Sequence, residues 1–572
     1  MDNTTVAKIL NEMAQIMELK EENRFKIIAF SNASRIIEGL SEDIKVLVEE
    51  NRIKEVRGIG DHLAKIITDL VTQGTSKEYE TMKKSIPEGV IYLLQIQGLG
   101  PKKVKLLYEK LKIKNVDELE RACKNHELAK VTGFGTKTEE NILKGITYLK
   151  KNVGKHFYPA ARFEAEKLKA YLLQSKEVEK IEVAGSLRRK KEYIGDIDLL
   201  ASAKNAKNVM DHFCQYPHID RILAKGDTKG SIVLTTGINA DLRLVKQNEF
   251  PYALHYFTGN KEHNTVIRGI AKDKGLKLNE YGLFKGTKNI LCKTEATLFN
   301  KLGLDYIEPE LRENQGEIEA AQKGTLPKNL VELKDLRGTF HNHTTESDGN
   351  ASLEAMVEKA GTLGFDYLGI SDHSQAAHYA HGLKPDRLKK QWKTIDLLNK
   401  KLKNFRILKG TEVDILSDGS LDYPDPILQQ FDFVIASVHS KFKMTEKEMT
   451  QRITKALKNK YVTMIGHPTG RLLLSREAYP IDLFQLVQVA SDYGKAMELN
   501  AHPRRLDIDW QICKFSKSKK VLVSINPDAH TTEGISDVQY GIGIARKGWL
   551  EKKDVLNTRS LSDILSFLKS YQ

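Results

Sequence analysis

The C-terminal part of the chain, residues 336–572, alternates short apolar runs with helical stretches, and this alternation restricts the fold more than any other feature. The apolar runs are Tyr367 to Ile370, Phe405 to Leu408, Phe433 to Ser437, Val462 to Ile465, Ala496 to Leu499 and Val521 to Ile525. Regular alternation of strand and helix favours βα units and a mainly parallel sheet. We therefore predict a barrel-like arrangement of parallel strands for this region.

Side chains that bind metals follow these apolar runs. The segment between His341 and His530 holds nine of the 16 histidines of the chain. The groups that follow strand-like segments are His341, His343, Asp348, Asp372, His373, Glu412, His439, His467, Asp528 and His530. Because the ends of parallel strands in a barrel share one rim, these groups should converge. Imidazoles with carboxylates suit zinc, manganese or iron, and a metal-activated water attacks phosphorus centres, so we predict phosphoester hydrolysis.

The chain has 572 residues, 40% hydrophobic and 29% charged, and this length exceeds what a single hydrophobic core accommodates. Lysine and arginine outnumber aspartate and glutamate by 90 to 76, and the net charge of +14 favours an anionic partner such as nucleic acid. The sequence has no apolar run of about 18 residues and no apolar N-terminal signal, so we expect a cytoplasmic protein without a membrane partner. The four cysteines are far apart and predict reduced thiols.

A short glycine motif recurs three times in the N-terminal region. The copies are Val56-Arg57-Gly58-Ile59-Gly60, Ile96-Gln97-Gly98-Leu99-Gly100 and Val131-Thr132-Gly133-Phe134-Gly135, and a helical start follows each of them. A Gly-x-Gly turn before a helix directs several amide N–H groups to one point, where a phosphate fits. Helix-hairpin-helix elements of this kind grip the DNA backbone without reading sequence. The predicted DNA contacts are Gly58, Gly60, Gly98, Gly100, Gly133 and Gly135, with Lys102, Lys103 and Lys137.

Residues 155–250 mix an apolar helix with strand-like runs and predict an α+β unit with a nucleotide site. The turn Gly185-Ser186-Leu187-Arg188-Arg189 follows a strand-like run and predicts a triphosphate cradle. Asp196 and Asp198 project from one strand face because side chains alternate, and Asp241 in a later strand can join them. Three carboxylates predict two Mg²⁺ or Mn²⁺ ions roughly 3.5 to 4 Å apart. One ion would activate a 3′-hydroxyl and the other hold the triphosphate, with Asp241 as candidate proton acceptor.

The residues just described resemble the family X DNA polymerases, the group of DNA polymerase beta, over residues 1–312. That family carries GSxRR, a DxD strand and a third aspartate in this order, and its Tyr-Phe-x-Gly segment reads Tyr256-Phe257-Thr258-Gly259 here. The nucleotide-binding residues predicted with this resemblance are Gly185, Ser186, Arg188, Arg189, Gly230, Tyr256, Phe257, Gly259, Asn264 and Arg268. The lyase lysine of polymerase beta falls on Ile66, next to Lys65, so lyase activity by that route is not expected.

The histidine-rich half resembles the polymerase and histidinol phosphatase (PHP) domain over residues 336–572. The resemblance implies a distorted seven-stranded (β/α)7 barrel that binds three ions of Mn²⁺, Zn²⁺ or Fe²⁺. The implied ligands are His341, His343, Asp348, His373, Glu412, His439, His467, Asp528 and His530, with Glu412 bridging two ions. His378, His381 and His502 match no ligand position, whereas Arg471, Arg504 and Arg505 lie near the same rim and can steer a phosphate backbone.

The order of these parts looks like that of the bacterial and archaeal PHP-containing family X DNA polymerases, a multidomain α+β architecture. We predict helical helix-hairpin-helix domains at 1–85 and 86–152, a nucleotidyltransferase palm at 153–247, a thumb at 248–312, a linker at 313–335 and the PHP domain at 336–572. The expected function is gap filling in DNA repair with 3′–5′ exonuclease. The expected partners are double-stranded DNA with gaps, nicks or 3′ ends and dNTPs, and the expected state is a monomer. The resemblance also suggests cleavage at abasic sites and removal of 3′-phosphates.

Two alternatives remain open on the sequence. Another nucleotidyltransferase, such as a tRNA-end adder or a small-molecule adenylyltransferase, shares the Gly-Ser turn and the paired aspartates. Such an enzyme does not need three DNA-gripping hairpins or the YFTG segment. In the second alternative the PHP domain is only structural, with ions that rigidify it, and the intact set of ligands argues against this.

Overall fold

The computed structural model describes the chain except for residues 2, 39–43, 57, 97 and 572. The chain divides into two compact units. The first consists of Met1–Val153 with the short segments Ser475–Glu477 and Thr531–Glu533, and the second contains the remaining residues. Among the described residues, no helix combines the length and the apolar character that crossing a membrane requires. The four cysteines are free.

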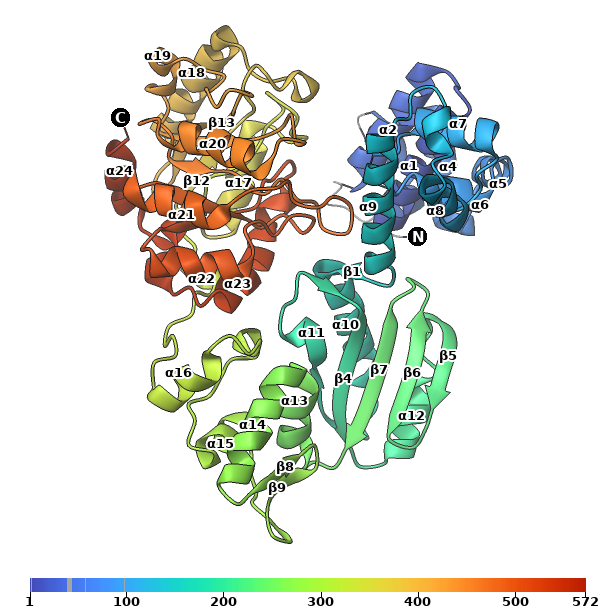
Figure 1. Ribbon diagram of the computed structural model, residues 1–572, viewed down its shortest axis with the longest axis vertical. Helices are drawn as coiled ribbons and strands as arrows, with labels where there is room; N and C mark the ends of the chain where they lie inside the picture. The colour runs from blue at the N-terminus through green and yellow to red at the C-terminus, as the bar shows by residue number, and fades with distance from the viewer. Residues whose placement is uncertain (2, 39–43, 57, 97, 572) are drawn as a thin grey trace. The chain divides into compact units, whose positions relative to one another are not determined.

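The first unit is helical (Figure 1). Its α-helices are α1 (Asn3–Leu19), α2 (Arg24–Glu38), α3 (Ile44–Glu49), α4 (Asp61–Gln73), α5 (Lys77–Lys84), α6 (Glu88–Leu93), α7 (Pro101–Leu111), α8 (Val116–Lys124) and α9 (Thr136–Asn152). The apolar stripe of α1 is buried, as its spacing predicts, and belongs to a hydrophobic cluster drawn from residues 6–82. A second cluster joins Leu19 to residues 90–146. The N-terminal region therefore builds two cores.

The glycine motifs form three turns of the same kind. The middle apolar residue of each, Ile59, Leu99 or Phe134, is buried, and its N–H donates over 3.0 Å to the carbonyl three residues earlier. The first glycine of each motif has a positive φ, +95° at Gly58, +89° at Gly98 and +94° at Gly133, which glycine adopts without strain. The second glycine precedes α4, α7 or α9. Arg57 and Gln97 of these motifs lie outside the described residues.

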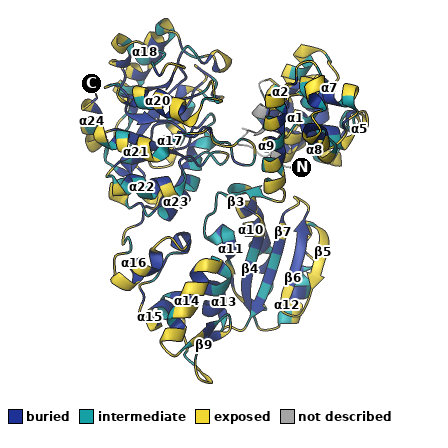
Figure 2. Ribbon diagram, in the orientation of Figure 1, coloured by how far each residue is buried: buried dark blue, intermediate teal, exposed yellow. Residues whose placement is uncertain are grey.

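The second unit begins with the predicted α+β region. A five-stranded sheet has the order β2 (Val178–Val183), β4 (Asp196–Ala203), β7 (Asn239–Val245), β6 (Lys229–Leu234) and β5 (Ile219–Lys225). Helices α10 (Tyr158–Leu172) and α12 (Ala206–Phe213) supply apolar residues to the core of this sheet, and β1 (His156–Phe157) pairs with β3 (Tyr193–Ile194). The strand β5 is mostly exposed at the edge (Figure 2). The face of β4 opposite Ile197 and Leu199 carries the predicted aspartates.

The region after the sheet contains α13 (Phe250–Thr258), α14 (Lys261–Asp273), the small sheet of β8 (Lys277–Asn279), β9 (Gly282–Lys285) and β10 (Lys288–Asn289), and α15 (Glu295–Lys301). The segment 313–335, which the sequence predicts to be a linker, contains the helix α16 (Glu317–Lys323). Ile318 and Ala321 of this segment belong to a hydrophobic cluster drawn from residues 252–330. The buried Glu317 carboxylate lies 2.7 Å from His263 Nδ1 and accepts the N–H groups of Asn314 and Gln315. Apolar periodicity does not reveal an element held by a buried carboxylate.

Residues 338–526 supply a seven-stranded parallel sheet with the strands in chain order. The strands are β11 (Gly338–Thr339), β12 (Tyr367–Ile370), β13 (Arg406–Asp414), β14 (Phe433–Ser437), β15 (Met464–Ile465), β16 (Ala496–Asn500) and β17 (Val523–Asn526). A bridge between Asn342 and Ala529 connects the first and last strands beyond their ends, so the sheet closes into a barrel. The sequence predicts six of the strands, and only β11, two residues long, is missed.

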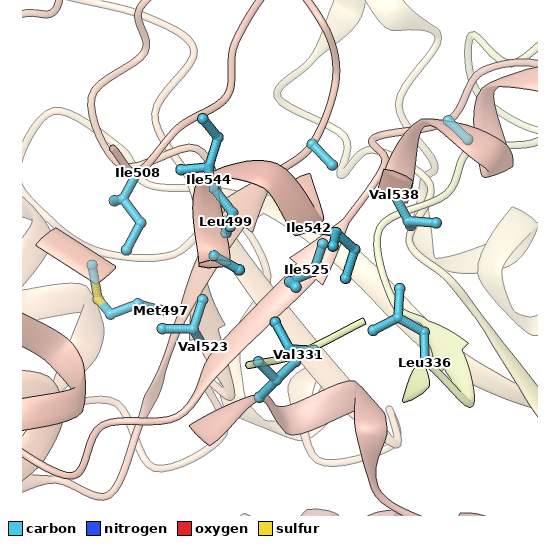
Figure 3. Close-up of a cluster of buried hydrophobic side chains, with 14 of the residues drawn as sticks. Val331, Leu336, Met497, Leu499, Ile508, Val523, Ile525, Val538, Ile542 and Ile544 are labelled. Atoms are coloured by element: carbon cyan, nitrogen blue, oxygen red, sulfur yellow. The ribbon is translucent and has the colours of Figure 1, made fainter. Parts of the chain in front are cut away.

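Helices surround the barrel strands, as α/β alternation requires. They are α17 (Leu353–Thr362), α18 (Pro385–Lys401), α19 (Asp425–Leu428), α20 (Glu446–Leu457), α21 (Leu483–Asp492), α22 (Trp510–Ser518), α23 (Val538–Lys547) and α24 (Leu561–Lys569). Figure 3 shows part of the largest hydrophobic cluster, in which Leu499 and Ile525 of the barrel strands pack near Val538 and Ile542 of α23. This packing anchors α23 to the barrel.

Candidate active sites

The three predicted catalytic aspartates lie on adjacent strands of the five-stranded sheet. β4 and β7 run parallel, and their register places Asp198 directly opposite Asp241. Asp196 lies two residues earlier on the same face of β4, because Ile197 and Leu199 between and beyond the aspartates are buried. The sheet thus brings together carboxylates that are more than 40 residues apart in sequence, as the alternation argument requires.

The acidic site is electrostatically strained without a cation. Burial, reinforced by Asp196 and Asp241, raises the pKa of Asp198 to about 7. Burial and Asp241 also raise the pKa of Asp196. The Nζ of Lys229 on β6 lies 3.3 Å from Oδ2 of Asp241 and offsets part of the negative charge of the three carboxylates. Oxygen ligands that repel one another in a partly buried site fit a divalent cation such as Mg²⁺ or Mn²⁺.

The Gly-Ser turn approaches the aspartates closely. The short helix α11 (Gly185–Arg188) follows β2, and Gly185 has a φ of +57°. A Cβ atom at Gly185 would lie 1.9 Å from Oδ2 of Asp198, so only glycine fits here. The hydroxyl oxygen of Ser186 is buried and has no hydrogen-bond partner among the described residues. A buried donor without a partner is unusual and suits a ligand oxygen beside the turn.

The two arginines of the turn, Arg188 and Arg189, form hydrogen bonds with residues of the region after the sheet. Arg188 donates to both carboxylate oxygens of Glu295, at 3.1 and 2.6 Å, and to Oγ1 of Thr258 at 2.5 Å. Arg189 donates to Glu313 at 3.2 Å and to the carbonyl oxygen of Thr258. The sequence identifies the cations of this turn but not the carboxylates that hold them. A phosphate-binding role for either arginine remains a prediction.

The YFTG segment forms the end of α13 and the turn after it. Asn264 on α14 donates to the carbonyl oxygen of Tyr256 over 2.7 Å, and its own Oδ1 is buried without a partner among the described residues. The Phe257 ring lies beneath the Arg243 guanidinium, 5.1 Å from its centroid. Gly259 has a φ of +70° beside Arg189, and Arg268 is exposed on α14.

Gly230 does not lie with the other predicted nucleotide-binding residues. It pairs with Leu242 in the sheet, so it faces the apolar side, opposite the aspartates. A Cβ atom at this position would meet Sδ of Met210 at 2.4 Å, and the packing of α12 therefore explains the glycine. We correct the prediction for this residue.

The barrel brings all nine predicted PHP ligands to one rim. They fall into four overlapping groups whose ligand atoms lie within 4.8 Å of one another. The groups are His343, Asp348, His373 and His530; His341, Glu412 and His467; His341, His343 and Asp528; and His373, Glu412 and His439. Four residues, Glu412, His341, His343 and His373, each belong to two groups, which is the arrangement that a multinuclear site requires.

Glu412 is at the centre of this cluster. One carboxylate oxygen lies 2.8 Å from Nε2 of His467 and 3.2 Å from Nε2 of His439, and the other lies 3.0 Å from Nδ1 of His373. Burial opposes ionisation, but the histidines, foremost His439, hold the pKa of Glu412 well below its ordinary value. Nε2 of His341 and both ring nitrogens of His343 are buried without hydrogen-bond partners in the described chain. Such orphaned nitrogens fit metal ions.

Further polar residues orient the ligands. Oε1 of the fully buried Glu498 on β16 lies 2.7 Å from Nδ1 of His341, and its Oε2 accepts the backbone N–H of His467 over 2.6 Å. Oδ1 of Asp414 lies 2.6 Å from Nδ1 of His439. Carboxylates commonly hold metal-binding histidines in this way. The sequence analysis does not identify Glu498 or Asp414, although both lie on barrel strands, where alternation decides which side chains share a face.

Other groups predicted at the rim have different roles. Asp372 accepts hydrogen bonds from Thr344, Ser347 and Gln391 and shapes the loop that carries Asp348. Arg505 lies 3.2 Å from Oδ2 of the ligand Asp528, so it belongs to the site. Arg471 donates instead to the backbone carbonyls of residues 505 and 506.

The helix-hairpin-helix turns present the features predicted for DNA binding. Their six glycines are exposed, as are Lys102 and Lys137, whereas Lys103 donates to the carbonyl oxygen of Gly98 over 3.3 Å. Ile66 is buried in the first core and Lys65 is exposed. The two side chains therefore point in different directions, so Lys65 cannot act as the lyase lysine expected at position 66.

Four segments match known domain families. Residues 1–76 match a helix-hairpin-helix domain, residues 90–147 a SAM-like helix-hairpin-helix tandem, residues 253–313 the DNA polymerase beta thumb and residues 339–502 the PHP domain. The order of these matches along the chain is the predicted one.

Full-length and partial relatives agree with these matches. The chain is 39% identical over 574 residues to the DNA polymerase/3′-5′ exonuclease PolX of Bacillus subtilis (strain 168), covering 100% of both proteins. A probable phosphatase of Thermoanaerobacter sp. (strain X514) is 29% identical over 245 residues, 40% of this chain and 93% of the phosphatase. A crystal structure of Leishmania infantum polymerase beta in a ternary primer–template complex overlaps 39% of this chain and 98% of its own, with 24% identity and a TM-score of 0.27.

Proposed function

The chain belongs to the family X DNA polymerases that carry a PHP domain, and from this premise we propose that it fills short gaps during DNA repair and trims 3′ ends. The enzyme is a DNA polymerase with 3′–5′ exonuclease activity. Template-directed nucleotidyl transfer belongs to the palm and phosphoester hydrolysis to the barrel. The two activities act on the same kind of substrate, a broken DNA strand, with opposite outcomes.

The register of Asp198 against Asp241 supports the polymerase site most directly. We assign Asp196, Asp198 and Asp241 as ligands of two Mg²⁺ or Mn²⁺ ions, which would supply Lewis-acid activation and neutralise the triphosphate. Asp241 accepts the proton of the primer 3′-hydroxyl. Burial and the neighbouring carboxylates of Asp196 and Asp241 raise the pKa of Asp198, and bound cations would relieve this repulsion. Gly185 and Ser186 line the path of the triphosphate, with Arg189 as its cationic partner.

The nuclease site uses the nine rim ligands. We propose that they hold Mn²⁺, Zn²⁺ or Fe²⁺ in three positions that share the four overlapping groups of ligand atoms. The ions would supply an activated water and stabilise charge on the scissile phosphate. Glu498 and Asp414 orient two of the imidazoles, and Arg505 beside Asp528 is placed to bind the phosphate. Cleavage at abasic sites and removal of 3′-phosphates are further hydrolyses of the same class.

The glycine hairpins complete the assignment. We propose that their exposed turns hold the sugar–phosphate backbone of double-stranded DNA at gaps, nicks and 3′ ends. The protein is proposed to act as a monomer in the cytoplasm, and dNTPs are its second substrate. Another nucleotidyltransferase would not need these turns. The ligand nitrogens without partners fit ions of either a catalytic or a structural barrel, and the shortening of a primer distinguishes the two.

A labelled primer on a duplex with a one-nucleotide gap tests both assignments together. With Mg²⁺ and dNTPs, we expect extension by the nucleotide complementary to the template. With Mn²⁺ and no dNTPs, we expect shortening from the 3′ end. Untemplated addition would favour the nucleotidyltransferase alternative, and extension without any shortening would favour the structural alternative for the barrel.

A further inference from the structure

Two buried glutamates at the end of the thumb bind cations from both the palm and the barrel. Glu310 lies 2.9 Å from Nζ of Lys190 and 2.9 Å from Nε of Arg546. Glu313 lies 3.2 Å from Nε of Arg189, 3.2 Å from Nζ of Lys191 and 2.5 Å from Nζ of Lys547. Arg189, Lys190 and Lys191 follow the Gly-Ser turn, whereas Arg546 and Lys547 end α23 of the barrel. The junction therefore has more cations than carboxylates.

Lys547 is the most firmly held of these cations. Its side chain has an exposed fraction of 0%, compared with 11% for Arg189 and 36% for Lys191. Val538 and Ile542 of the same helix pack in the barrel core (Figure 3), so the backbone that carries Lys547 has little freedom. Burial alone would raise the pKa of Glu313, but the cations, foremost Lys547, lower it to about 2, so the carboxylate stays charged.

The helix approaches the palm turn itself. A Cβ atom at Gly543 on α23 would lie 3.0 Å from Cδ of Lys190. Glycine at this position lets the helix pass close to the turn that the proposed function assigns to the triphosphate. The barrel and the triphosphate turn are thus in direct contact through Lys190 and indirectly linked through Glu313.

Arg189 can bind a triphosphate only if it leaves one of its present partners. It already donates to Glu313 and to the carbonyl oxygen of Thr258, so it must leave the carboxylate to bind a triphosphate. A buried carboxylate that loses its only cation is strongly destabilised. Glu313 retains Lys547 and Lys191 when Arg189 departs. The cost of releasing Arg189 is therefore reduced by a lysine that belongs to the nuclease domain.

We propose that Lys547 is a positioning residue for nucleotide addition, which stays paired with Glu313 and thereby releases Arg189 to the triphosphate of the incoming dNTP. The inference rests on the proposed function of the Gly-Ser turn and goes beyond it, because it assigns a role in DNA synthesis to a helix of the nuclease barrel. The prediction is specific: removing the charge of Lys547 weakens dNTP binding without disturbing the nuclease reaction.

Single-nucleotide gap filling by the full-length protein tests this role. For Lys547→Met we expect the KM for dNTP to rise by about tenfold, the effect of roughly one charge-assisted hydrogen bond, with kcat changed less than about threefold. Exonuclease activity with Mn²⁺, measured on the same preparation, should stay within about twofold of wild type and reports that the barrel is folded. Lys547→Arg keeps the ion pair and should restore the wild-type KM.

A double variant separates release of Arg189 from a general structural effect. In Lys547→Met with Glu313→Gln the competing carboxylate is absent, so the KM should return to within about threefold of wild type. Lys552→Met removes another lysine of the barrel, which is paired with Asp335, and should leave the KM unchanged. If Lys547→Met does not fold, Lys547→Gln keeps a hydrogen-bonding group without the charge and should show the same rise in KM.

The inference is overturned by a wild-type KM in a folded Lys547→Met or Lys547→Gln protein, or by a raised KM that persists in the double variant. An equal rise in Lys552→Met would also overturn it. These results leave the proposed function intact, since wild-type protein would still extend the primer. Failure of wild-type protein to extend a gapped primer would instead refute the proposed function.

Discussion

Glu498 holds His341 through a contact of 2.7 Å between Oε1 and Nδ1, at a point where both side chains are fully buried. The other oxygen of Glu498 accepts the backbone N–H of His467, so one carboxylate orients two of the predicted metal ligands. The contact leaves Nε2 of His341 facing Glu412 at 3.5 Å and Asp528 at 3.4 Å. The residue that organises the nuclease site is therefore not itself one of its predicted ligands.

Glu498→Gln should weaken metal binding at the barrel rim. The amide keeps the size of the side chain but has only one acceptor oxygen, so it cannot accept hydrogen bonds from both His341 and the backbone N–H of His467. Loss of such a partner typically lowers metal affinity or activity ten- to hundredfold. We expect exonuclease activity to fall by about this factor, with reduced metal content by elemental analysis. Gap filling should be unchanged. Full metal occupancy with normal exonuclease would show that Glu498 is dispensable.

His341→Ala combined with His343→Ala should abolish the exonuclease, since each residue contributes to two ligand clusters. Primer extension should continue at a rate within about threefold of wild type, because the aspartates of the palm are untouched. Substituting His381, which lies outside the ligand clusters, provides the matched control. Retained exonuclease in the double variant would mean that the barrel is not the nuclease site.

Asp196→Ala combined with Asp198→Ala should reduce primer extension by more than about a hundredfold, because both residues are proposed metal ligands and have no substitute on β4. Binding to a gapped duplex, measured by fluorescence anisotropy, should persist through the hairpins. Exonuclease activity in the same protein serves as the folding control. Unchanged extension would refute the assignment of the palm site.

Asp198→Asn should stabilise the metal-free protein at alkaline pH. Burial and the neighbouring aspartates raise the pKa of Asp198 from its ordinary value of 3.8 to about 7 in the folded state. The folded state therefore binds the extra proton, and wild-type stability falls as pH rises from about 4 to 7. The neutral asparagine escapes this loss, and we expect a gain of about 1 to 2 kcal/mol at pH 8.5, discounted for partial exposure. Near pH 4 the difference should vanish.

Thermal unfolding in the presence of a chelator measures this pH dependence. The exposed Asp227→Asn is the control and should show no pH-dependent difference from wild type. Mg²⁺ competes with the same proton, so Mg²⁺ affinity of the wild-type palm should increase between pH 6 and 8. A stability difference that grows toward acidic pH would contradict the assigned direction.

Gly185→Ala should disable nucleotide addition. The new Cβ would lie 1.9 Å from Oδ2 of Asp198 at a residue with a φ of +57°, so either the turn or the metal ligand must move. We expect a loss of stability of roughly 1–3 kcal/mol and loss of most gap filling. Gly195→Ala, where a Cβ meets no atom within 4 Å, is the matched control. Normal gap filling by Gly185→Ala would show that the turn does not approach the catalytic aspartates.

Much of each site could be predicted because its signals are local. Alternation along β4 places Asp196 and Asp198 on one face, and a histidine after an apolar run indicates a strand end. Both signals depend only on neighbouring residues and not on the tertiary fold. The contacts that could not be predicted from the sequence are those between side chains far apart along the chain. Glu295 and Glu313, the partners of Arg188 and Arg189, lie 107 and 124 residues away from them in sequence. The prediction of Gly230 as a nucleotide-binding residue is wrong because the order of the strands, which the sequence does not state, decides which face of the sheet meets α12.

The sequence by itself determined which side chains are candidate metal ligands, in what order they occur and which parallel or alternating elements carry them, because these properties follow from residue chemistry and short-range periodicity. Tertiary structure alone decided that β7 lies beside β4, that Glu498 and Asp414 orient the imidazoles and that Lys547 of the barrel contacts Glu313. The physical reason is that strand order and the partners of buried charges depend on packing between segments far apart in the chain, which neighbouring sequence does not specify.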